Sequence, residues 1–296
     1  MVKVKYILGI CMIVLLTATG WGLSVWHQDA VQAKGTDIIA SIPVKADVAY
    51  VSDDFTLPDK DNDKPVYDKY TIAQRKEKGL PLTYGKTRDY YYGDHVAYLT
   101  FDDGPNDHNT MEILDILKKE NIHATFFLTG QNVKQYPEVV KKIYASGNAI
   151  GVHSYSHDYK KIYVSPKAYT DELLQTEQLI YDVIHVRPII SRAPGGTKGH
   201  FTKPFWQAID DIGYIEVGWN ALTGDADGTG KTPEKSVENV RTQIAERPYL
   251  NKHLVVLMHD AYGHHATVEA LPNLIKMLKD QGYTFRVVTT AIPPSW

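Results

Sequence analysis

Apolar runs alternate with segments of helical period from residue 96 to the end of the chain. Short apolar runs predict buried strands at residues 96–101, 124–128, 149–152, 189–190, 214–217, 254–258 and 283–288. Apolar residues on one helical face predict helices at residues 110–120, 137–147, 166–184, 204–211, 233–246 and 266–280. The alternation indicates an α/β fold with a parallel sheet and crossover helices. About seven parallel strands favour a closed or nearly closed (β/α) barrel over a small open sheet.

Polar side chains follow four of the predicted strands. Asp102 and Asp103 come after the first strand, and His153 comes after the third. Arg192 follows the fourth strand, and His259 follows the last but one. Since β/α barrels place their catalytic groups at the carboxyl ends of the strands, we expect these side chains to share one site.

Two of these motifs carry groups that bind metal. Asp102-Asp103 supplies paired carboxylates, and adjacent residues leave a strand in different directions, so that the two can have different roles. His153 and His157 have the spacing that places both imidazoles on one face of a helical turn. One oxygen and two nitrogen ligands can hold a divalent cation and leave positions for water and substrate. The pattern therefore favours metal-assisted hydrolysis, with the second carboxylate available as a general base.

The remaining motifs supply groups that assist such a reaction. Arg192 beside a carboxylate base would keep it ionised and oriented. The glycines at 195–196 leave backbone N–H groups free to face a developing oxyanion. His259 can give a proton to a leaving amine, with Asp260 or Asp225 holding its tautomer.

Each motif alone also has an ordinary structural explanation. Asp-Gly and Gly-Pro are common turn dipeptides, and a chain with 12 histidines contains chance pairs at this spacing. A strand-end arginine often pairs with a surface acid, and a histidine before Asp260 can precede a helix that this residue caps. The joint occurrence of the motifs at one end of a β/α array favours the functional interpretation.

The N-terminal segment predicts export. Lys3 and Lys5 precede an apolar run from residue 6 to residue 26, which is long enough to span a bilayer. A cleavage site after Ala33 is the alternative, so residues 1–33 are either a signal peptide or a membrane anchor. Both place the rest of the chain outside the cytoplasm.

The remaining chain divides into two regions. Residues 34–94 are rich in aspartate and interrupted by proline, which predicts an extracytoplasmic stalk or linker with short ordered pieces. Residues 95–296 then form the catalytic domain. A net charge of -3 argues against a general nucleic-acid binder. The single cysteine, Cys11, excludes an intramolecular disulfide and a thiolate cluster, so any metal must bind histidine and carboxylate groups.

At these motifs the chain resembles the polysaccharide deacetylase family, carbohydrate esterase family 4, from about Val96 to the C-terminus. The first motif matches in full at residues 100–105 and the second at residues 153–157. The resemblance implies a distorted (β/α) barrel and one divalent metal ion. It implies zinc first, with cobalt, nickel and manganese as alternatives, bound by Asp103, His153 and His157.

The resemblance also implies catalytic roles. Asp102 matches the general base and Arg192 matches the arginine that orients this base. His259 matches the general acid, and Leu257 matches the residue that lines the pocket for the acetyl methyl group.

Two motifs depart from the family pattern. Gly195 stands where an aromatic residue usually follows the proline, although the implied oxyanion donor is a backbone N–H and is retained. Asp225 is the best match to the fourth-motif aspartate, but Ala226 replaces the usual tryptophan. Trp219 is a candidate to fill the methyl pocket instead. These departures affect the predicted substrate choice more than the reaction type.

Together these features predict metal-dependent hydrolysis of N-acetyl groups from an N-acetylhexosamine polysaccharide of the cell envelope, with peptidoglycan as the first candidate. One alternative is an esterase that removes O-acetyl groups from polysaccharides. Another is a carbohydrate-binding protein with a weakened site. The predicted partners are an N-acetylated polysaccharide and, through the N-terminal segment, the membrane, but no nucleic acid.

Overall fold

The computed structural model describes residues 46–85 and 87–294. The predicted signal peptide or membrane anchor at residues 1–33, with Cys11, lies outside these ranges, as does the first part of the predicted stalk. Within the described ranges, no helix is both long enough and apolar enough to cross a membrane.

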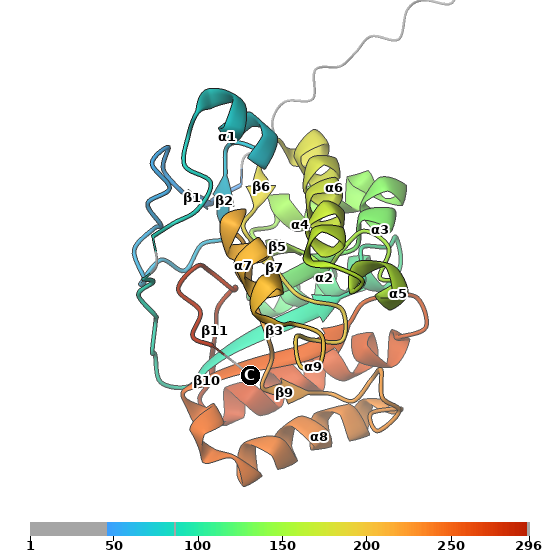
Figure 1. Ribbon diagram of the computed structural model, residues 1–296. Coiled ribbons are helices and arrows are strands. Elements are labelled where there is room, and N and C mark those ends of the chain that lie inside the picture. Colours follow the sequence, from blue (N-terminus) through green and yellow to red (C-terminus); the bar gives the residue numbers. More distant parts are fainter. Residues whose placement is uncertain (1–45, 86, 295–296) are drawn as a thin grey trace, which may run out of the picture. The chain divides into compact units, whose positions relative to one another are not determined.

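Seven parallel strands form the path of the main sheet (Figure 1). Their order across the sheet is β8 (Ile215–Glu216), β7 (Ile190–Ser191), β5 (Ala149–Val152), β4 (Thr125–Leu128), β3 (Val96–Asp102), β10 (His253–His259) and β9 (Ala221–Leu222). An additional strand, β11 (Thr284–Phe285), pairs with the first residues of β3, while β4 pairs with its last residues. The central strand β3 is therefore paired on both of its edges.

The sheet curls because its two edge strands are joined by a short connection. β8 and β9 are consecutive along the chain, and only residues 217–220 lie between them. These five Cα–Cα steps reach at most about 19 Å, whereas seven flat strands at about 4.8 Å spacing would put the edges about 29 Å apart. The edges must approach each other, which confirms the predicted distorted (β/α) barrel of about seven parallel strands.

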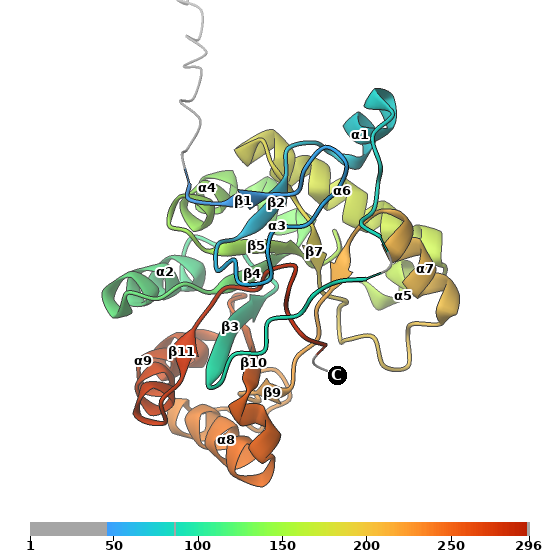
Figure 2. The same cartoon turned by 90° about the vertical axis from the view of Figure 1, so that its left-hand side faces the viewer.

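One layer of helices covers the outer face of the curled sheet (Figures 1 and 2). Neighbouring helices pack in the order α7 (Lys203–Asp211), α6 (Pro166–Ile184), α4 (Pro137–Ala145), α2 (Asn109–Glu120), α9 (His265–Asp280) and α8 (Pro233–Glu246). This order follows that of the strands, because most of these helices connect neighbouring strands. Proline opens α4, α6 and α8, where its fixed φ suits the first turn and its missing N–H costs nothing.

The two faces of the sheet bury different apolar groups. Along β3, Leu99 and Phe101 belong to the large core between the sheet and the helices. Val96 and Tyr98 belong to a second cluster, which contains no helical residue and therefore lies on the inner face. Since successive strand residues point to opposite faces, Asp102 at the end of β3 shares the inner face with Val96 and Tyr98.

The structure also contains short elements that the hydrophobic pattern did not predict. Among them are β9, α3 (Gly130–Gln135) and α5 (Tyr159–Ile162). Conversely, the strands predicted at 214–217 and 283–288 are shortened to two residues each. Elements of two to six residues are too short to have a periodicity of their own, so tertiary contacts decide where they form.

Residues 46–85 and 87–94, which belong to the predicted stalk, pack into the fold. A three-stranded sheet is formed by β1 (Ala49–Tyr50), β2 (Val66–Asp68) and β6 (Arg187–Pro188). β2 pairs antiparallel with β6, which precedes barrel strand β7. Tyr67 and Ile72 belong to the main hydrophobic core. For these described residues the structure therefore differs from an extended linker, because several of their apolar side chains are buried.

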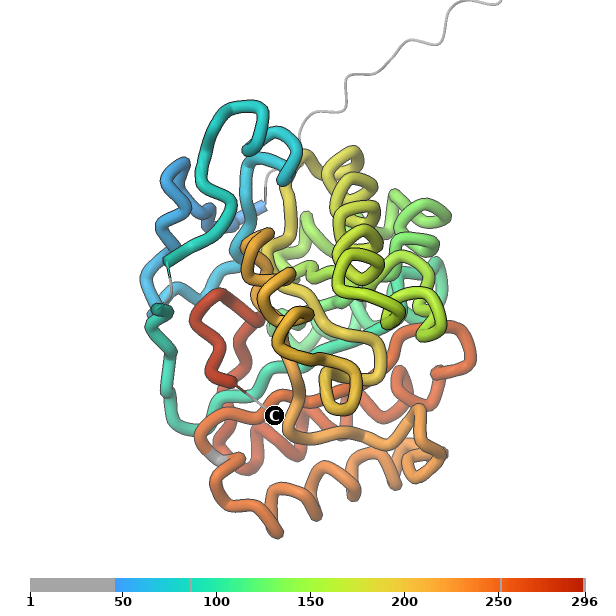
Figure 3. Tube along the Cα trace, viewed as in Figure 1, coloured from blue at the N-terminus to red at the C-terminus, as the bar shows by residue number. Residues whose placement is uncertain are grey.

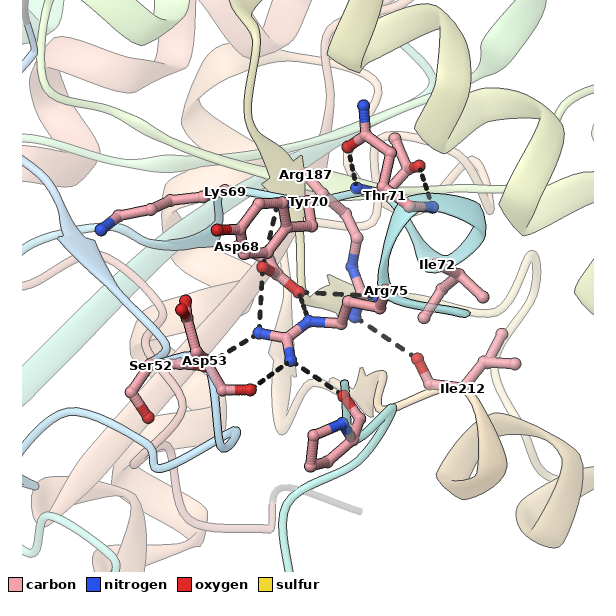
Figure 4. A network of polar contacts seen from close by, with 12 residues as sticks. Ser52, Asp53, Asp68, Lys69, Tyr70, Thr71, Ile72, Arg75, Arg187 and Ile212 are labelled. Carbon is pink, nitrogen blue, oxygen red and sulfur yellow. Dashed lines mark hydrogen bonds and ion pairs between the residues drawn. The ribbon is translucent and has the colours of Figure 1, made fainter. Parts of the chain in front are cut away.

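A buried ion pair holds this N-terminal region together (Figure 4). Arg75, on α1 (Ile72–Lys78), donates hydrogen bonds from Nε and Nη2 to the two carboxylate oxygens of Asp68. Its other guanidinium hydrogens go to the carbonyl oxygens of Ser52, Asp53 and Pro81. Both side chains are fully buried, so Arg75 is the main group that neutralises Asp68, with Arg187 at 4.0 Å as a more distant second partner.

Replacing Arg75 with methionine should lower the free energy of unfolding by about 3–5 kcal/mol, because Asp68 would remain buried without its main partner. Denaturant unfolding of both proteins measures this difference. Lys76→Met, at an exposed position of the same helix, is the matched control and should change stability by no more than about 0.5 kcal/mol. Equal stability of the Arg75→Met and Lys76→Met variants would contradict the account of this region.

Candidate active site

Strands β3 and β10 bring the first and last motifs side by side. The two strands pair along their full length, so that Asp102 lies opposite His259 and Thr100 lies opposite Leu257. Figure 3 shows the two segments of the trace running together. Leu257 and His259 have the same strand parity as Val255, which belongs to the inner cluster. All four side chains of the two motifs therefore belong to the inner face.

Arg192 holds the Asp102 carboxylate in place. Its Nη1 donates to Oδ1 of Asp102 at 2.8 Å and to Oγ1 of Thr100 at 2.7 Å. Nε and Nη2 donate to the carbonyl oxygens of Val217 and Gly218, each at 3.0 Å. Burial lowers the pKa of Arg192 from its usual value, and the charge of Asp102 opposes this shift. These four hydrogen bonds fix the guanidinium in the position from which it holds Asp102.

Asp103 points toward two imidazoles. Its φ of 76° lies in the left-handed region, so the backbone leaves the extended strand conformation at this residue. Oδ1 of Asp103 lies 3.4 Å from Nε2 of His153 and 3.2 Å from Nε2 of His157. The structure thus brings together the three residues that the sequence analysis expected to be ligands.

This group has the features of a cation site. Oδ1 of Asp103 is buried and accepts no hydrogen bond from any described residue, which is costly for a carboxylate oxygen. Nδ1 of His153 lies 2.7 Å from the carbonyl oxygen of Arg192, to which it can donate. Nε2 of His153 is then left with a free lone pair. Burial lowers the pKa of His153 despite the neighbouring carboxylates, which favours the neutral ring. The oxygen and two nitrogens suit a divalent ion of the zinc class.

The two histidines do not lie on a helical turn, in contrast to what their spacing suggested. His153 directly follows β5, and the residues after it form a loop rather than a helix. Ser154 has a φ of 60° and His157 a φ of 54°. These two left-handed residues bend the backbone so that His157 returns toward Asp103.

Glu172, on α6, braces this loop. Its Oε2 accepts hydrogen bonds from the backbone N–H groups of Tyr155 and Ser156, at 3.0 and 2.9 Å. Its Oε1 accepts from the hydroxyl of Ser156 at 2.7 Å. Glu172 could not be predicted from the sequence, because an acid on a polar face of a predicted helix has no feature that distinguishes it from a solvated residue.

Glu216 is a second positioning residue that the sequence analysis missed. It accepts hydrogen bonds from the Ser191 hydroxyl, at 2.7 Å, and from the Ala193 backbone N–H. These two residues flank Arg192, so Glu216 fixes the strand end that carries the guanidinium. Burial raises the pKa of Glu216 to about 7. An acid inside the apolar run 214–217 was the one feature that pointed to it.

Asp225 holds His259 in place. Its Oδ1 lies 3.0 Å from Nδ1 of His259, and its Oδ2 accepts from the His259 backbone N–H at 2.8 Å. Burial lowers the pKa of His259, but the hydrogen bond and charge of Asp225 outweigh it and raise the pKa to about 9. At neutral pH the ring is therefore protonated, which is the state that a general acid requires.

Asp260, the other predicted partner for His259, instead contacts Thr110 and Gly104. Its Oδ2 accepts a hydrogen bond from the Thr110 hydroxyl, and its carboxylate packs so closely on Gly104 that any Cβ there would collide with it. Burial raises the pKa of Asp260 to about 7. Because α9 begins at His265, Asp260 does not cap that helix.

Gly195 and Gly196 have φ values of 70° and 84°, which residues with a Cβ rarely adopt. A Cβ on Gly195 would collide with the hydroxyl of Tyr159, and one on Gly196 would approach the ring of Trp219. The Trp219 ring also lies 5.7 Å from the guanidinium carbon of Arg192. The absence of an aromatic residue at 195 thus has a physical reason, because Tyr159 already fills that space. The predicted roles of Trp219 and Leu257 in a methyl pocket stay predictions.

The expected role of the Gly195 N–H as an oxyanion donor predicts that Gly195→Ala lowers the hydrolysis rate by about 10²–10³-fold, the usual effect of losing one such donor. The methyl group would strain the left-handed backbone and displace Tyr159, so the N–H would leave its position. Gly199→Ala is a matched control, since Gly199 has a φ of 83° and a Cβ there would meet no atom within 4 Å. Rates measured on one substrate should separate the two variants, and an equal loss in both would show that backbone strain alone is responsible.

Comparison with known proteins agrees with this geometry. A sequence description of the family named polysaccharide deacetylase matches residues 90–217. A peptidoglycan-N-acetylglucosamine deacetylase of Bacillus cereus is 35% identical over 193 residues, which are 64% of this chain and 68% of the relative. This chain belongs to the polysaccharide deacetylase family.

Solved structures of polysaccharide deacetylases extend this comparison to the fold. The catalytic domain of a peptidoglycan N-acetylglucosamine deacetylase from Eubacterium rectale superposes with a TM-score of 0.63 and 32% identity, covering 71% of this chain and 96% of that domain. A CE4 esterase from Streptococcus mutans superposes with a TM-score of 0.63 and 28% identity, covering 72% of this chain and 94% of the esterase. The deacetylase fold therefore accounts for most of residues 46–294.

Proposed function

We propose that this protein removes N-acetyl groups from an N-acetylhexosamine polysaccharide of the cell envelope, with peptidoglycan as the favoured substrate. The observation that carries the proposal is the convergence of Asp103, His153 and His157 beside two further groups, Asp102 and His259, that lie opposite each other in the sheet. The similar proteins from Bacillus cereus and Eubacterium rectale are named peptidoglycan N-acetylglucosamine deacetylases, which supports the substrate class.

We assign one divalent metal ion, zinc first, to Asp103, His153 and His157. When bound there, such an ion polarises the amide carbonyl and lowers the pKa of water. The protein supplies one carboxylate oxygen and two imidazole nitrogens, and it keeps His153 in the required tautomer through the Arg192 carbonyl. With three protein ligands, positions remain for water and for the substrate carbonyl.

Asp102 takes the proton from the attacking water. Its Oδ1 is held by Arg192, while its Oδ2 faces His153 at 3.8 Å and is thus beside the proposed metal site. Arg192 keeps the carboxylate fixed, so that little reorientation is needed when the proton arrives.

His259 delivers a proton to the other side of the reacting amide. The water oxygen forms a bond to the carbonyl carbon, and the backbone N–H of Gly195 stabilises the resulting oxyanion. His259 then protonates the amide nitrogen, the carbon–nitrogen bond breaks, and acetate and an amine leave. Asp225 stabilises the charged imidazole before the transfer, through its hydrogen bond to Nδ1.

Removal of O-acetyl groups is the alternative activity, and the similar CE4 esterase from Streptococcus mutans supports it. The same residues would act on an ester, whose leaving alcohol needs less assistance from His259 than an amine. A carbohydrate-binding protein with a weakened site is less well supported, since the residues proposed as ligands, base, orienting arginine and acid lie close together.

We also propose that the protein acts outside the cytoplasm. The basic and apolar segment at residues 1–33 supports a signal peptide or anchor, and the catalytic domain then begins near residue 95 with residues 46–94 packed against it. Protease added to cells with intact membranes but no wall should digest the catalytic domain, unless the protein is already in the medium. Full protection of a cytosolic protein would contradict this location.

A substrate panel tests the proposed specificity. The purified protein is incubated with peptidoglycan, with N-acetylglucosamine oligomers and with O-acetylated xylan, and acetate is measured in each reaction. The proposal expects release from the first two substrates, with peptidoglycan preferred. Release of acetate from the xylan alone would contradict N-deacetylation and support the esterase activity.

A further inference from the structure

A second group of ligand-type side chains surrounds the proposed general acid. Asp225, His259 and His264 each offer one ligand atom, and these atoms all lie within 4.8 Å of one another. The ring centroids of His259 and His264 are 5.2 Å apart. The group shares no residue with the proposed catalytic metal site, so it is a separate cluster at the edge of the same active site.

His264 has a ring nitrogen with no use in the mechanism. Its Nδ1 atom is buried and has no hydrogen-bond partner among the described residues, although the side chain as a whole is 23% exposed. Nδ1 lies 3.9 Å from Oδ2 of Asp225, which already accepts hydrogen bonds from the His259 N–H and from Thr267. An unpaired nitrogen directed at a carboxylate is an arrangement that a cation between them would satisfy.

We propose that Asp225, His259 and His264 form a second site for a divalent cation of the zinc class, and that its occupation takes His259 out of catalysis. Two imidazole nitrogens with one carboxylate oxygen are a ligand set that zinc prefers over magnesium or calcium. When the ion binds, it replaces the proton on Nδ1 of His259. This proton goes to solvent, and the lone pair of Nδ1 bonds to the ion. The ring is then no longer the imidazolium that donates a proton to the leaving amine.

The geometry indicates that this second site is the weaker of the two. In the proposed catalytic site, Asp103 lies 3.2 and 3.4 Å from its two histidines, close to the separation of ligands around one zinc ion. In the second group, His264 must move closer to Asp225 from 3.9 Å. His264 lies in the short connection between β10 and α9, next to Gly263, so the proposal requires only a local adjustment there. The enzyme should therefore be active with one ion and inhibited by excess zinc.

A zinc titration of the full chain tests this inference. The protein is stripped with a chelator and titrated with zinc, and the number of bound ions is measured by calorimetry and by metal analysis. We expect two ions, the second bound more weakly. His264→Phe, which keeps a ring but removes the nitrogen, should bind one ion only.

His265→Phe is the matched control. His265 belongs to an exposed group with His108 and Glu112 that could also hold a metal ion. The variant should retain the second ion. Loss of the second ion in His265→Phe but not in His264→Phe would overturn the proposal and move the site to the surface group. If His264→Phe does not fold, His264→Asn serves in its place.

The inhibitory effect rests on the proposed role of His259, whereas binding of the second ion does not. Each protein's rate with one equivalent of zinc serves as its own reference. Excess zinc should slow the wild type at least about tenfold, given the ~10²–10⁴-fold contribution of a general acid. The His264→Phe variant should keep its rate. Two ions bound without inhibition would contradict the role of His259, while a single ion at all zinc concentrations would contradict the second site.

Discussion

Replacing Asp102 with asparagine should lower the deacetylation rate by about 10²–10⁴-fold while the metal content stays unchanged. Asparagine keeps an oxygen that can accept the hydrogen bond from Arg192, so the strand end should keep its shape. It cannot accept the proton of the attacking water. The measurement is the turnover rate together with metal analysis of the same sample.

The expected loss is specific to this carboxylate. Asp115→Asn changes an exposed aspartate on α2, outside the site, and is the control for a loss of negative charge. It should keep the wild-type rate. Full turnover by a metal-loaded Asp102→Asn variant would mean that another group is the base.

Replacing His157 with alanine should remove both the metal and the activity. Losing one of three protein ligands should reduce metal affinity at least about 100-fold. Even the loss of a group that only hydrogen-bonds to a ligand typically reduces metal affinity about 10–100-fold. His153→Ala should have the same effect and should also destabilise the fold, because His153 is buried whereas His157 is partly exposed. Equilibrium dialysis against zinc, followed by metal analysis, compares the variants.

His123→Ala is the control for this experiment, because His123 is an exposed histidine outside the proposed site. It should bind one catalytic ion with the wild-type affinity. Wild-type metal content in both His153→Ala and His157→Ala would exclude the proposed ligand set.

The fold was largely predictable because its long strands are apolar on both faces. The run at residues 96–101 and its partner at 254–258 correspond to strands β3 and β10, which carry Asp102 and His259 at their ends. The region at 46–94 could not be predicted in the same way. Its strands are very short, and their stability depends on contacts with β6 and on the Arg75–Asp68 pair, which join residues from separate parts of the chain.

The residues of the site that lie in sequence motifs were predictable. The backbone conformation that brings them together was not. Asp103, His153 and His157 come together as expected, but they do so through left-handed residues in loops and not through a helical turn. Glu172 and Glu216 act through hydrogen bonds to the backbone, so no motif identifies them. The residues alone left Asp225 and Asp260 open as partners of His259, whereas the family resemblance favoured Asp225. In the structure Asp225 lies 3.0 Å from Nδ1 of His259.

A single reaction can decide whether the protein is a metal-dependent N-deacetylase. Chelated protein and the same protein with one equivalent of zinc are incubated with an N-acetylglucosamine oligomer, and both acetate and new primary amine are measured. The account predicts equal amounts of acetate and amine, formed only with the metal. Acetate without amine, or equal rates with and without metal, would contradict it.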